Sequence, residues 1–260
     1  MIRYISLIIF TLATFCRLTT NAPAENQPWD EVFFRANQAY KEGHLQEAID
    51  GYHKLLNSGH ISGHLYYNLG NAHFRLNHIG RAILAYERAR LLIPRDADLN
   101  FNLRYALGQT LDAIPESRDI ITMTFFWLRD LNMEELFWGF AILNTLFWGV
   151  LLIRLFLQPE WTFYISIIFL IFWLIAGVSF GMKWRQIESN DQAVILQKEV
   201  NVLAGPDIRD TVLFRLHEGA IVHHERSEDS WSLVRLPDEK RGWVQADAME
   251  RINSAPLPTS

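Results

Sequence analysis

The sequence predicts a multidomain chain in which an all-α helical repeat, a transmembrane helical hairpin and a small all-β barrel follow one another. Three observations support this fold class. Residues 29–96 resemble themselves at a fixed offset, and two long apolar runs without internal charge follow them. From Ala193 onward, short β-type runs separated by turn residues replace the helical periodicity.

The composition agrees with this division of the chain. Its 260 residues are 50% hydrophobic and 20% charged, and its mean hydropathy is +0.02. Charged side chains are concentrated in residues 25–130 and 183–260, and in both segments Asp and Glu outnumber Lys and Arg. Because phosphate binding requires clustered Lys and Arg, we expect no nucleic-acid partner.

The N-terminal residues 1–24 have the features of a signal peptide. Arg3 forms a short charged region, residues 4–15 form an apolar region, and residues 22–24 offer small side chains for cleavage. The alternative is an uncleaved anchor, which gives the same sidedness to the residues that follow. The single Cys, Cys16, lies in this leader, so the mature chain has no Cys for a disulfide, a zinc site or a nucleophile. These features are typical of a bacterial envelope protein.

The self-similar region contains two copies of one pattern. Residues 36–40 align with residues 70–74, and the register continues through the following helix. Small residues stand where helices are expected to touch, notably Gly70 and Ala82, while aromatic residues fill the space between helices and a Pro follows the second copy. A period of about 34 residues with these features is typical of the tetratricopeptide repeat, which residues 29–96 therefore resemble.

A third copy begins at Ala97 but loses the later residues of the pattern. Its apolar stripe predicts a capping helix over residues 98–107, so that the repeat region spans residues 29–110. Residues 111–135 are then a linker, and the aromatic residues within 124–131 predict an interfacial segment before the first apolar run.

The resemblance to tetratricopeptide proteins implies a concave groove lined by the first helix of each repeat. The residues that it assigns to this groove are Asn37, Tyr40 and Lys41 from the first copy, and Tyr67, Asn71, Phe74 and Arg75 from the second. Asn side chains can hold a peptide backbone, and Lys or Arg can hold carboxylates. The alternative is that these are ordinary solvated helix residues.

Two apolar runs decide the expected topology. Residues 136–153 contain nothing more polar than Asn144 and Thr145, and residues 161–182 contain no charge. Each run has about the 20 residues that a helix needs to cross the hydrocarbon core. Because only a short loop with Pro159 separates them, we expect an antiparallel hairpin that places both flanking regions on one side of the membrane.

The two signals for sidedness conflict. The leader directs residues 25–130, and through the hairpin residues 183–260, to the periplasm. Lys183 and Arg185 flank the second run, where the positive-inside rule predicts the cytoplasm. We give the leader more weight and expect a bacterial inner-membrane protein with both soluble parts in the periplasm.

The C-terminal region predicts a small β-barrel. Turn residues such as Gly205-Pro206 and Pro237-Asp238 separate short runs rich in Val, Ile, Leu and Trp. We expect strands over six of these runs, which are residues 194–196, 200–203, 213–216, 221–225, 231–236 and 242–244.

The order of motifs in this region resembles the bacterial SH3 domain over residues 191–252, which leaves 253–260 as a tail. The motifs that carry the resemblance are Val200-Asn201-Val202 before Gly205-Pro206, then Glu218-Gly219, then Trp231, then Gly242-Trp243-Val244. The resemblance implies a module that binds cell-wall peptides or protein segments, with Trp231 and Trp243 as candidate surface residues. For both Trp side chains, a structural role in the barrel core is the alternative.

No residue pattern indicates catalysis. His60 and His64 have a chelating spacing, but they flank a turn and have no matching carboxylate; His223 and His224 are adjacent in a strand and so point to opposite faces. The sequence also contains no phosphate-binding loop and no nucleophile elbow. We therefore expect no enzyme, no catalytic residue and no metal or cofactor site.

The order of leader, repeat, hairpin and SH3-type module resembles the BatE-like family of the bacterial aerotolerance operon. Residues 94–107, with the run Asp-Leu-Asn-Phe-Asn-Leu before the apolar segments, are also similar to that family. The resemblance implies a non-enzymatic scaffold whose partners are von Willebrand A-type membrane proteins and a MoxR-type ATPase. Two functions stay open. One is a scaffold that binds protein partners through its groove and SH3 module, and the other is a membrane protein that binds or senses peptidoglycan.

Overall fold

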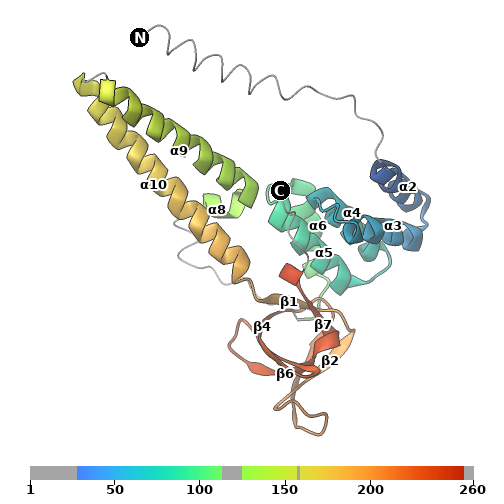
Figure 1. Ribbon diagram of the computed structural model, residues 1–260. Coiled ribbons are helices and arrows are strands. Elements are labelled where there is room, and N and C mark those ends of the chain that lie inside the picture. The colour runs from blue at the N-terminus through green and yellow to red at the C-terminus, as the bar shows by residue number, and fades with distance from the viewer. Residues whose placement is uncertain (1–27, 113–124, 157–158, 255–260) are drawn as a thin grey trace.

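A computed structural model describes residues 28–112, 125–156 and 159–254. Figure 1 shows three parts, which are a group of short helices, a long helical hairpin and a curled sheet. The predicted signal peptide, residues 1–24, lies outside the described residues, as do part of the linker and the end of the tail.

Within the described residues, the first part consists of five helices. They are α2 (Pro28–Glu42), α3 (Leu45–Asn57), α4 (Gly63–Arg75), α5 (Ile79–Leu92) and α6 (Ala97–Leu107). Gly43 and Asn77, which occupy the same position in the two copies, both adopt left-handed backbone conformations in the turns after α2 and α4, with φ of 87° and 58°. Ser62 and Asp96 cap α4 and α6 by accepting the backbone N–H three residues later, at 3.1 and 2.8 Å. The period in the sequence is therefore also a period of turns and caps.

The helices pack at the positions where the sequence places small residues. Ala48 and Ala82 are fully buried, and Tyr52 and Tyr86 fill the space between helices. A Cβ atom on Gly70 would lie 2.5 Å from the ring of Tyr86, so a larger residue does not fit there without a shift. The predicted helix contacts at Gly70 and Ala82 are confirmed.

The second part contains α8 (Trp127–Asp130), α9 (Met133–Phe156) and α10 (Glu160–Glu188). By length and composition, α9 and α10 could each cross a membrane, and Figure 1 shows them side by side as the predicted hairpin. Between them, Trp173 Nε1 donates a hydrogen bond to Asn144 Oδ1 at 3.0 Å. This bond pairs two polar groups that would otherwise face hydrocarbon in a bilayer.

The third part is a sheet of seven antiparallel strands in the spatial order β3-β2-β6-β5-β4-β1-β7. The strands are β1 (Gln192–Ile195), β2 (Glu199–Leu203), β3 (Val212–His217), β4 (Ile221–Glu228), β5 (Trp231–Arg235), β6 (Arg241–Gln245) and β7 (Met249–Arg251). Each of the first six overlaps one of the six predicted runs, with ends that differ by up to three residues. The seventh was missed because three residues are too few to show an alternating pattern.

The sheet curls without closing. Strands β3 and β7 occupy its two edges and do not pair with each other, so the closed SH3 barrel that we expected is not confirmed. Register shifts after Val202 and His224 bend β2 and β4. After β7 the chain turns away from the sheet into a short 3-10 helix, η2 (Ile252–Ser254), which contacts α5.

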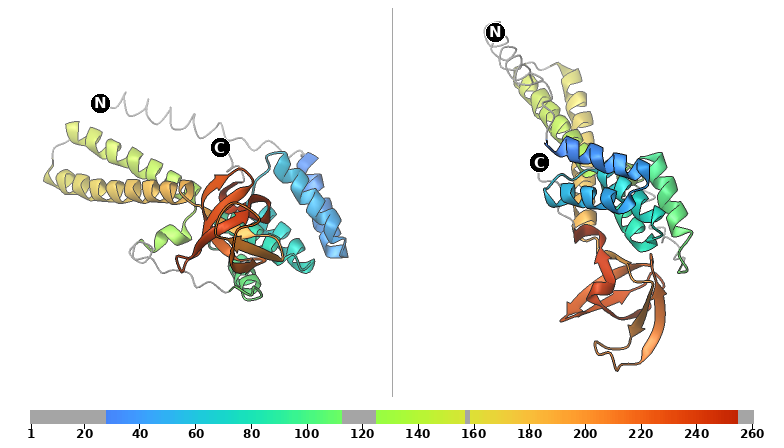
Figure 2. Two further views of the ribbon diagram at one scale, coloured as in Figure 1. Left: turned by 90° about the horizontal axis from the view of Figure 1, so that it is seen from below. Right: turned by 90° about the vertical axis from the view of Figure 1, so that its right-hand side faces the viewer.

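The sheet packs directly against the helical repeat. Val194 of β1 and Ile252 of η2 belong to the same buried apolar cluster as the core of the repeat. A Cβ atom on Gly80, near the start of α5, would lie 2.5 Å from the carbonyl oxygen of Ile195. Figures 1 and 2 show the sheet beside this helix. The core of the repeat therefore extends into the interface with the sheet, while the sheet keeps a second buried apolar cluster of its own.

Polar contacts complete this interface. Glu218 Oε1 accepts the backbone N–H of Gly80 at 2.9 Å, which supplies the cap that α5 lacks from its own N-cap side chain. Arg88 Nε donates to the carbonyl oxygen of Ile252 at 3.1 Å, and Arg88 Nη2 donates to Glu250 Oε1 at 2.7 Å. The sheet thus holds both the first turn and the third turn of α5.

The hairpin is fastened to both soluble parts. Asn132 Nδ2, just before α9, donates to the carbonyl oxygen of Leu92 at the end of α5, at 3.1 Å. Asn253 Nδ2 of η2 donates to the carbonyl oxygen of Ile187 at the end of α10, at 2.6 Å. The hairpin therefore meets the soluble parts at two separate points.

We expect Gly80→Ala to separate the sheet from α5, because the added Cβ would collide with a backbone carbonyl that cannot rotate away. The expected cost is about 1–3 kcal/mol of unfolding free energy, with faster amide hydrogen exchange in α5 and β1. Gly108→Ala is the matched control, since the nearest atom to its Cβ is 3.4 Å away. Equal exchange rates in the two variants would contradict this account of the interface.

Candidate protein-binding face

The candidate binding surface is the face shared by α2, α4 and α6, the first helices of successive repeat units, which we call the first-helix face. All seven residues predicted for the groove lie on α2 or α4. Two of them, Lys41 and Arg75, are exposed. The other five are half-buried, and these are Asn37, Tyr40, Tyr67, Asn71 and Phe74. Helix α6 adds Phe101, Asn102 and Tyr105, which sequence reasoning did not assign.

A hydrogen-bond network joins the helices behind this face. Asn37 Oδ1 of α2 accepts the hydroxyl of Tyr52 at 2.8 Å and the Nδ2 of Asn68 at 3.0 Å. Tyr52 belongs to α3 and Asn68 to α4. One amide oxygen therefore connects three consecutive helices.

The same arrangement recurs at the matching positions of the second copy. Asn71 Oδ1 accepts the hydroxyl of Tyr86 at 2.7 Å and the Nδ2 of Asn102 at 2.9 Å, which joins α4, α5 and α6. The Nδ2 of Asn102 also lies 3.1 Å from the hydroxyl oxygen of Tyr67, to which it donates. Sequence reasoning missed the roles of Asn68 and Asn102, although one repeat period separates the two residues and was a usable signal.

This network gives the oxygen and the nitrogen of each predicted Asn side chain different roles. The Oδ1 atoms of Asn37 and Asn71 each accept two bonds within the repeat and are not open to a ligand. In the described part of the chain, no hydrogen bond uses their Nδ2 atoms. The repeat therefore orients both amides so that their N–H groups can donate to a ligand carbonyl.

The phenols that fix these amides stay protonated at physiological pH. Burial, and then the proximity of Tyr40, raises the pKa of Tyr52 to about 12. Burial, and then Tyr67 and Tyr40, raises the pKa of Tyr86 in the same direction. Both hydroxyls therefore remain hydrogen-bond donors to the Asn oxygens.

One end of the first-helix face is cationic. Arg75 Nη1 donates to the carbonyl oxygen of Tyr40 at 2.8 Å, and its guanidinium lies 4.8 Å from the centroid of the Tyr40 ring. Among the residues that the structure describes, neither Arg75 nor Lys41 forms an ion pair with an acidic side chain. A ligand carboxylate would therefore meet two cations that are not already neutralised.

The other end is aromatic. The Phe74 ring meets Tyr105 edge-on with 5.7 Å between centroids, and Tyr105 stacks on Phe101 at 6.4 Å. The side chains of Phe101 and Tyr105 are 61% and 54% exposed. This pair was missed because the third copy of the pattern is incomplete, although Phe101 occupies the position in that copy that the groove residue Tyr67 occupies in the second.

The two Trp residues predicted for the surface of the sheet lie in different environments. Trp243 is 6% exposed, and the guanidinium of Arg226 lies 5.2 Å from the centroid of its ring. Trp231 is half-buried. Trp243 therefore contributes mainly to the core, and Trp231 leaves more ring surface open to a ligand.

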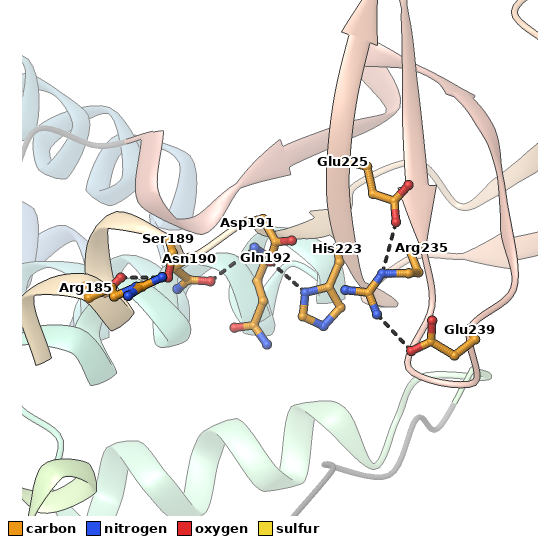
Figure 3. A network of polar contacts seen from close by, with 9 residues as sticks. All are labelled: Arg185, Ser189, Asn190, Asp191, Gln192, His223, Glu225, Arg235 and Glu239. Atoms are coloured by element: carbon orange, nitrogen blue, oxygen red, sulfur yellow. Dashed lines mark hydrogen bonds and ion pairs between the residues drawn. The ribbon is translucent and has the colours of Figure 1, made fainter. Parts of the chain in front are cut away.

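The sheet also carries a polar network, drawn in Figure 3, near the end of α10. Asp191 Oδ1 lies 2.7 Å from His223 Nδ1, and Arg235 Nε donates to Glu225 Oε1 at 3.1 Å. These contacts join the residue just before β1 to β4, and β4 to β5. In the described residues, no group of three or more His, Cys, Asp or Glu side chains could hold a metal ion.

A comparison with protein families finds the tetratricopeptide repeat at residues 63–96, which cover α4, α5 and the turn before α6. No curated protein matches the chain. The chain therefore contains a tetratricopeptide repeat, a module typical of protein–protein interaction. The first copy has the same turns and the same Asn–Tyr hydrogen bond as the matched copy.

His73, on the opposite side of α4, is 4% exposed, and its Nδ1 has no hydrogen-bond partner among the described residues. Burial, and then the nearby His53 and Arg81, lowers the pKa of His73 from 6.5 to about 4. The folded protein therefore excludes a proton that the unfolded chain binds. The resulting stability is complete above pH 6.5 and is lost as the pH falls toward 4.

We expect acidification from pH 7 to pH 5 to lower the free energy of unfolding by about 2 kcal/mol through His73. His73→Leu should remove most of this dependence, which thermal unfolding of the full chain in detergent at both pH values measures. The control is His64→Leu, because His64 is exposed on the same helix. If both variants lose stability as the unmodified protein does, His73 is not the source.

Proposed function

We propose that this chain is a non-enzymatic scaffold of the bacterial inner membrane that holds protein partners on its first-helix face in the periplasm. The observation that carries the proposal is that this face presents oriented amide N–H donors beside cationic side chains. The Asn37 and Asn71 amides are fixed from behind and present N–H donors, while Lys41 and Arg75 are cations without an acidic partner in the described residues. An extended peptide offers the backbone carbonyls and carboxylates that complement these groups.

The proposed membrane placement rests on α9 and α10 and on the contact between the soluble parts. The packing of Gly80 and Val194 in one interface supports a placement of the repeat and the sheet on the same side of a bilayer, which an antiparallel hairpin also gives. The leader makes that side the periplasm. Lys183, which opposed this sidedness, is 7% exposed and donates to the carbonyl oxygen of Leu128 at 2.6 Å. Its role in packing reduces its weight as a topological signal.

A more specific identity for the chain rests on the resemblance of residues 191–252 to the bacterial SH3 domain and of the module order to the BatE-like family. We propose that the curled sheet is an SH3-type module and that the chain is a BatE-like component of an aerotolerance system. Its partners would then be von Willebrand A-type membrane proteins and a MoxR-type ATPase. The order of modules along the chain and the six strands at the expected positions support this identity.

Peptidoglycan binding through the sheet is the second candidate function. It is favoured by Trp231, which is only half-buried and leaves part of its ring exposed to solvent. Co-sedimentation of the full chain with purified peptidoglycan separates the two. Sedimentation that Trp231→Ala abolishes would support wall binding. Sedimentation at the level of an unrelated membrane protein would leave the scaffold as the function.

We expect the double variant Lys41→Glu with Arg75→Glu to lose partners in a membrane pull-down while keeping its fold. Both side chains are exposed, where substitutions usually cost about 0.5 kcal/mol or less, although Arg75 also gives up its bond to Tyr40. The control is Lys54→Glu with Arg81→Glu, which makes the same charge change at exposed positions outside the first-helix face. If the first double variant retains every partner while Trp231→Ala loses them, the sheet carries the recognition.

We expect alkaline phosphatase fused after Ser260 to be active, because the leader and the hairpin return the C-terminus to the periplasm. The same reporter fused after Phe156, at the end of α9, should be inactive because only one span precedes it. Activity at Phe156 with none at Ser260 would invert the topology.

A further inference from the structure

We propose that Phe101 and Tyr105 form the apolar anchor site of the first-helix face. The partner that fits is an extended protein segment in which a large apolar side chain lies about four residues from an acidic one. This inference rests on the proposed function and names the class of segment that the face takes.

The first observation is the exposure of this aromatic pair. In the preceding unit, Tyr67 is half-buried and its ring lies 6.1 Å from that of Tyr86 on the following helix. In the part of the chain that the structure describes, no helix follows α6 in the stack, and Phe101 and Tyr105 remain 61% and 54% exposed. Their stacked rings form a preordered apolar surface, which reduces the entropy lost when a ligand side chain binds.

The second observation is that the aromatic pair is continuous with the polar part of the face. Phe74 contacts Tyr105, and its neighbour in the chain, Arg75, covers the ring of Tyr40. The Nδ2 atom of Asn71 belongs to the same helix, one turn earlier. A single extended segment that crosses α2, α4 and α6 would therefore meet cations first, an amide donor next and the aromatic pair last.

The charge of the face selects the chemistry of that segment. Lys41 and Arg75 have no acidic partner in the described residues, so burial of a basic segment beside them is unfavourable and that of an acidic one is favourable. At the other end, the two stacked rings favour a large apolar side chain.

The spacing follows from helix geometry. Neighbouring packed helices lie about 8–10 Å apart. The guanidinium of Arg75 lies between α2 and α4, so α6 is about one and a half spacings away, or about 12–15 Å. An extended chain rises about 3.3 Å per residue, which separates the acidic and apolar side chains by about four residues.

A random-peptide selection on the full chain in lipid nanodiscs tests this inference. The probe is a phage library of random twelve-residue peptides that are joined to the phage coat protein through their C-termini, so that no terminal carboxylate is free. Empty nanodiscs serve as background. We expect enriched peptides to carry Asp or Glu three to five positions from Trp, Phe, Leu or Met. The same selection is run on Phe101→Ala with Tyr105→Ala, on Phe34→Ala, and on Lys41→Glu with Arg75→Glu.

We expect the Phe101→Ala, Tyr105→Ala variant to reduce recovery of these peptides at least tenfold and to remove the apolar preference while the acidic preference stays. Phe34→Ala is the matched control, because this ring is 69% exposed at the opposite end of the stack and should change neither preference. Phe101→Leu with Tyr105→Leu should restore part of the recovery, which separates lost contact from lost folding.

The outcomes distinguish this inference from the proposed function. Enriched peptides that are acidic but lack an apolar residue, or that bind the Phe101→Ala, Tyr105→Ala variant equally well, would overturn the anchor and keep the first-helix face. A smaller oligomer for that variant than for the unmodified protein would show that a second copy covers the pair, which also overturns the anchor. Peptides unaffected by Lys41→Glu with Arg75→Glu, or no enrichment over empty nanodiscs, would overturn the proposed function itself.

Discussion

The close approach of α5 to the sheet is the constraint on which the rest of the molecule depends. Gly80 of α5 meets the carbonyl oxygen of Ile195, and a Cβ atom on Gly219 would lie 2.8 Å from the side chain of Ile83 in α5, so both sides of the contact favour glycine. Gly219 also has φ of 87°, which glycine adopts without strain. Stacks of this kind usually need three or more units to bury a core. Here the sheet takes the place of a further unit, and Val194 and Ile252 enter the repeat core.

This arrangement assigns the two sides of the repeat to different tasks. The second helix of the matched repeat, α5, is covered by the sheet, while α2, α4 and α6 keep their shared face open. Tyr86 connects the two sides, because it belongs to α5 and its hydroxyl orients Asn71. The amide donors of the proposed binding face are thus set by side chains whose own positions depend on the docked sheet.

Features that repeat within a short stretch of chain were predictable from the sequence. The period of the helical repeat, the two uncharged runs and the alternating strands each report local structure, and all of them appear in the fold. The docking of the sheet was not predictable, because Gly80 and Glu218 are 138 residues apart and belong to no periodic pattern. A glycine in the first turn of a helix was the one local sign of a close approach. The exposed pair on α6 was missed for a related reason, since exposure depends on what a distant segment covers. For Trp243, a role in the core was one of the two predicted alternatives, and its 6% exposure agrees with that alternative.

The length of α10 has a consequence for which partners the scaffold can meet. Its 29 residues extend about 43 Å, against about 30 Å of hydrocarbon, so in the proposed membrane placement an untilted α10 extends about 13 Å beyond the bilayer core. Only Ser189, Asn190 and Asp191 separate this helix from β1, and the bond from Asn253 to Ile187 stiffens the joint. A domain on a rigid helix reaches a smaller volume than one on a flexible linker. In the proposed placement it samples a thin layer above the membrane, where proteins anchored in the same bilayer would reach a high effective concentration.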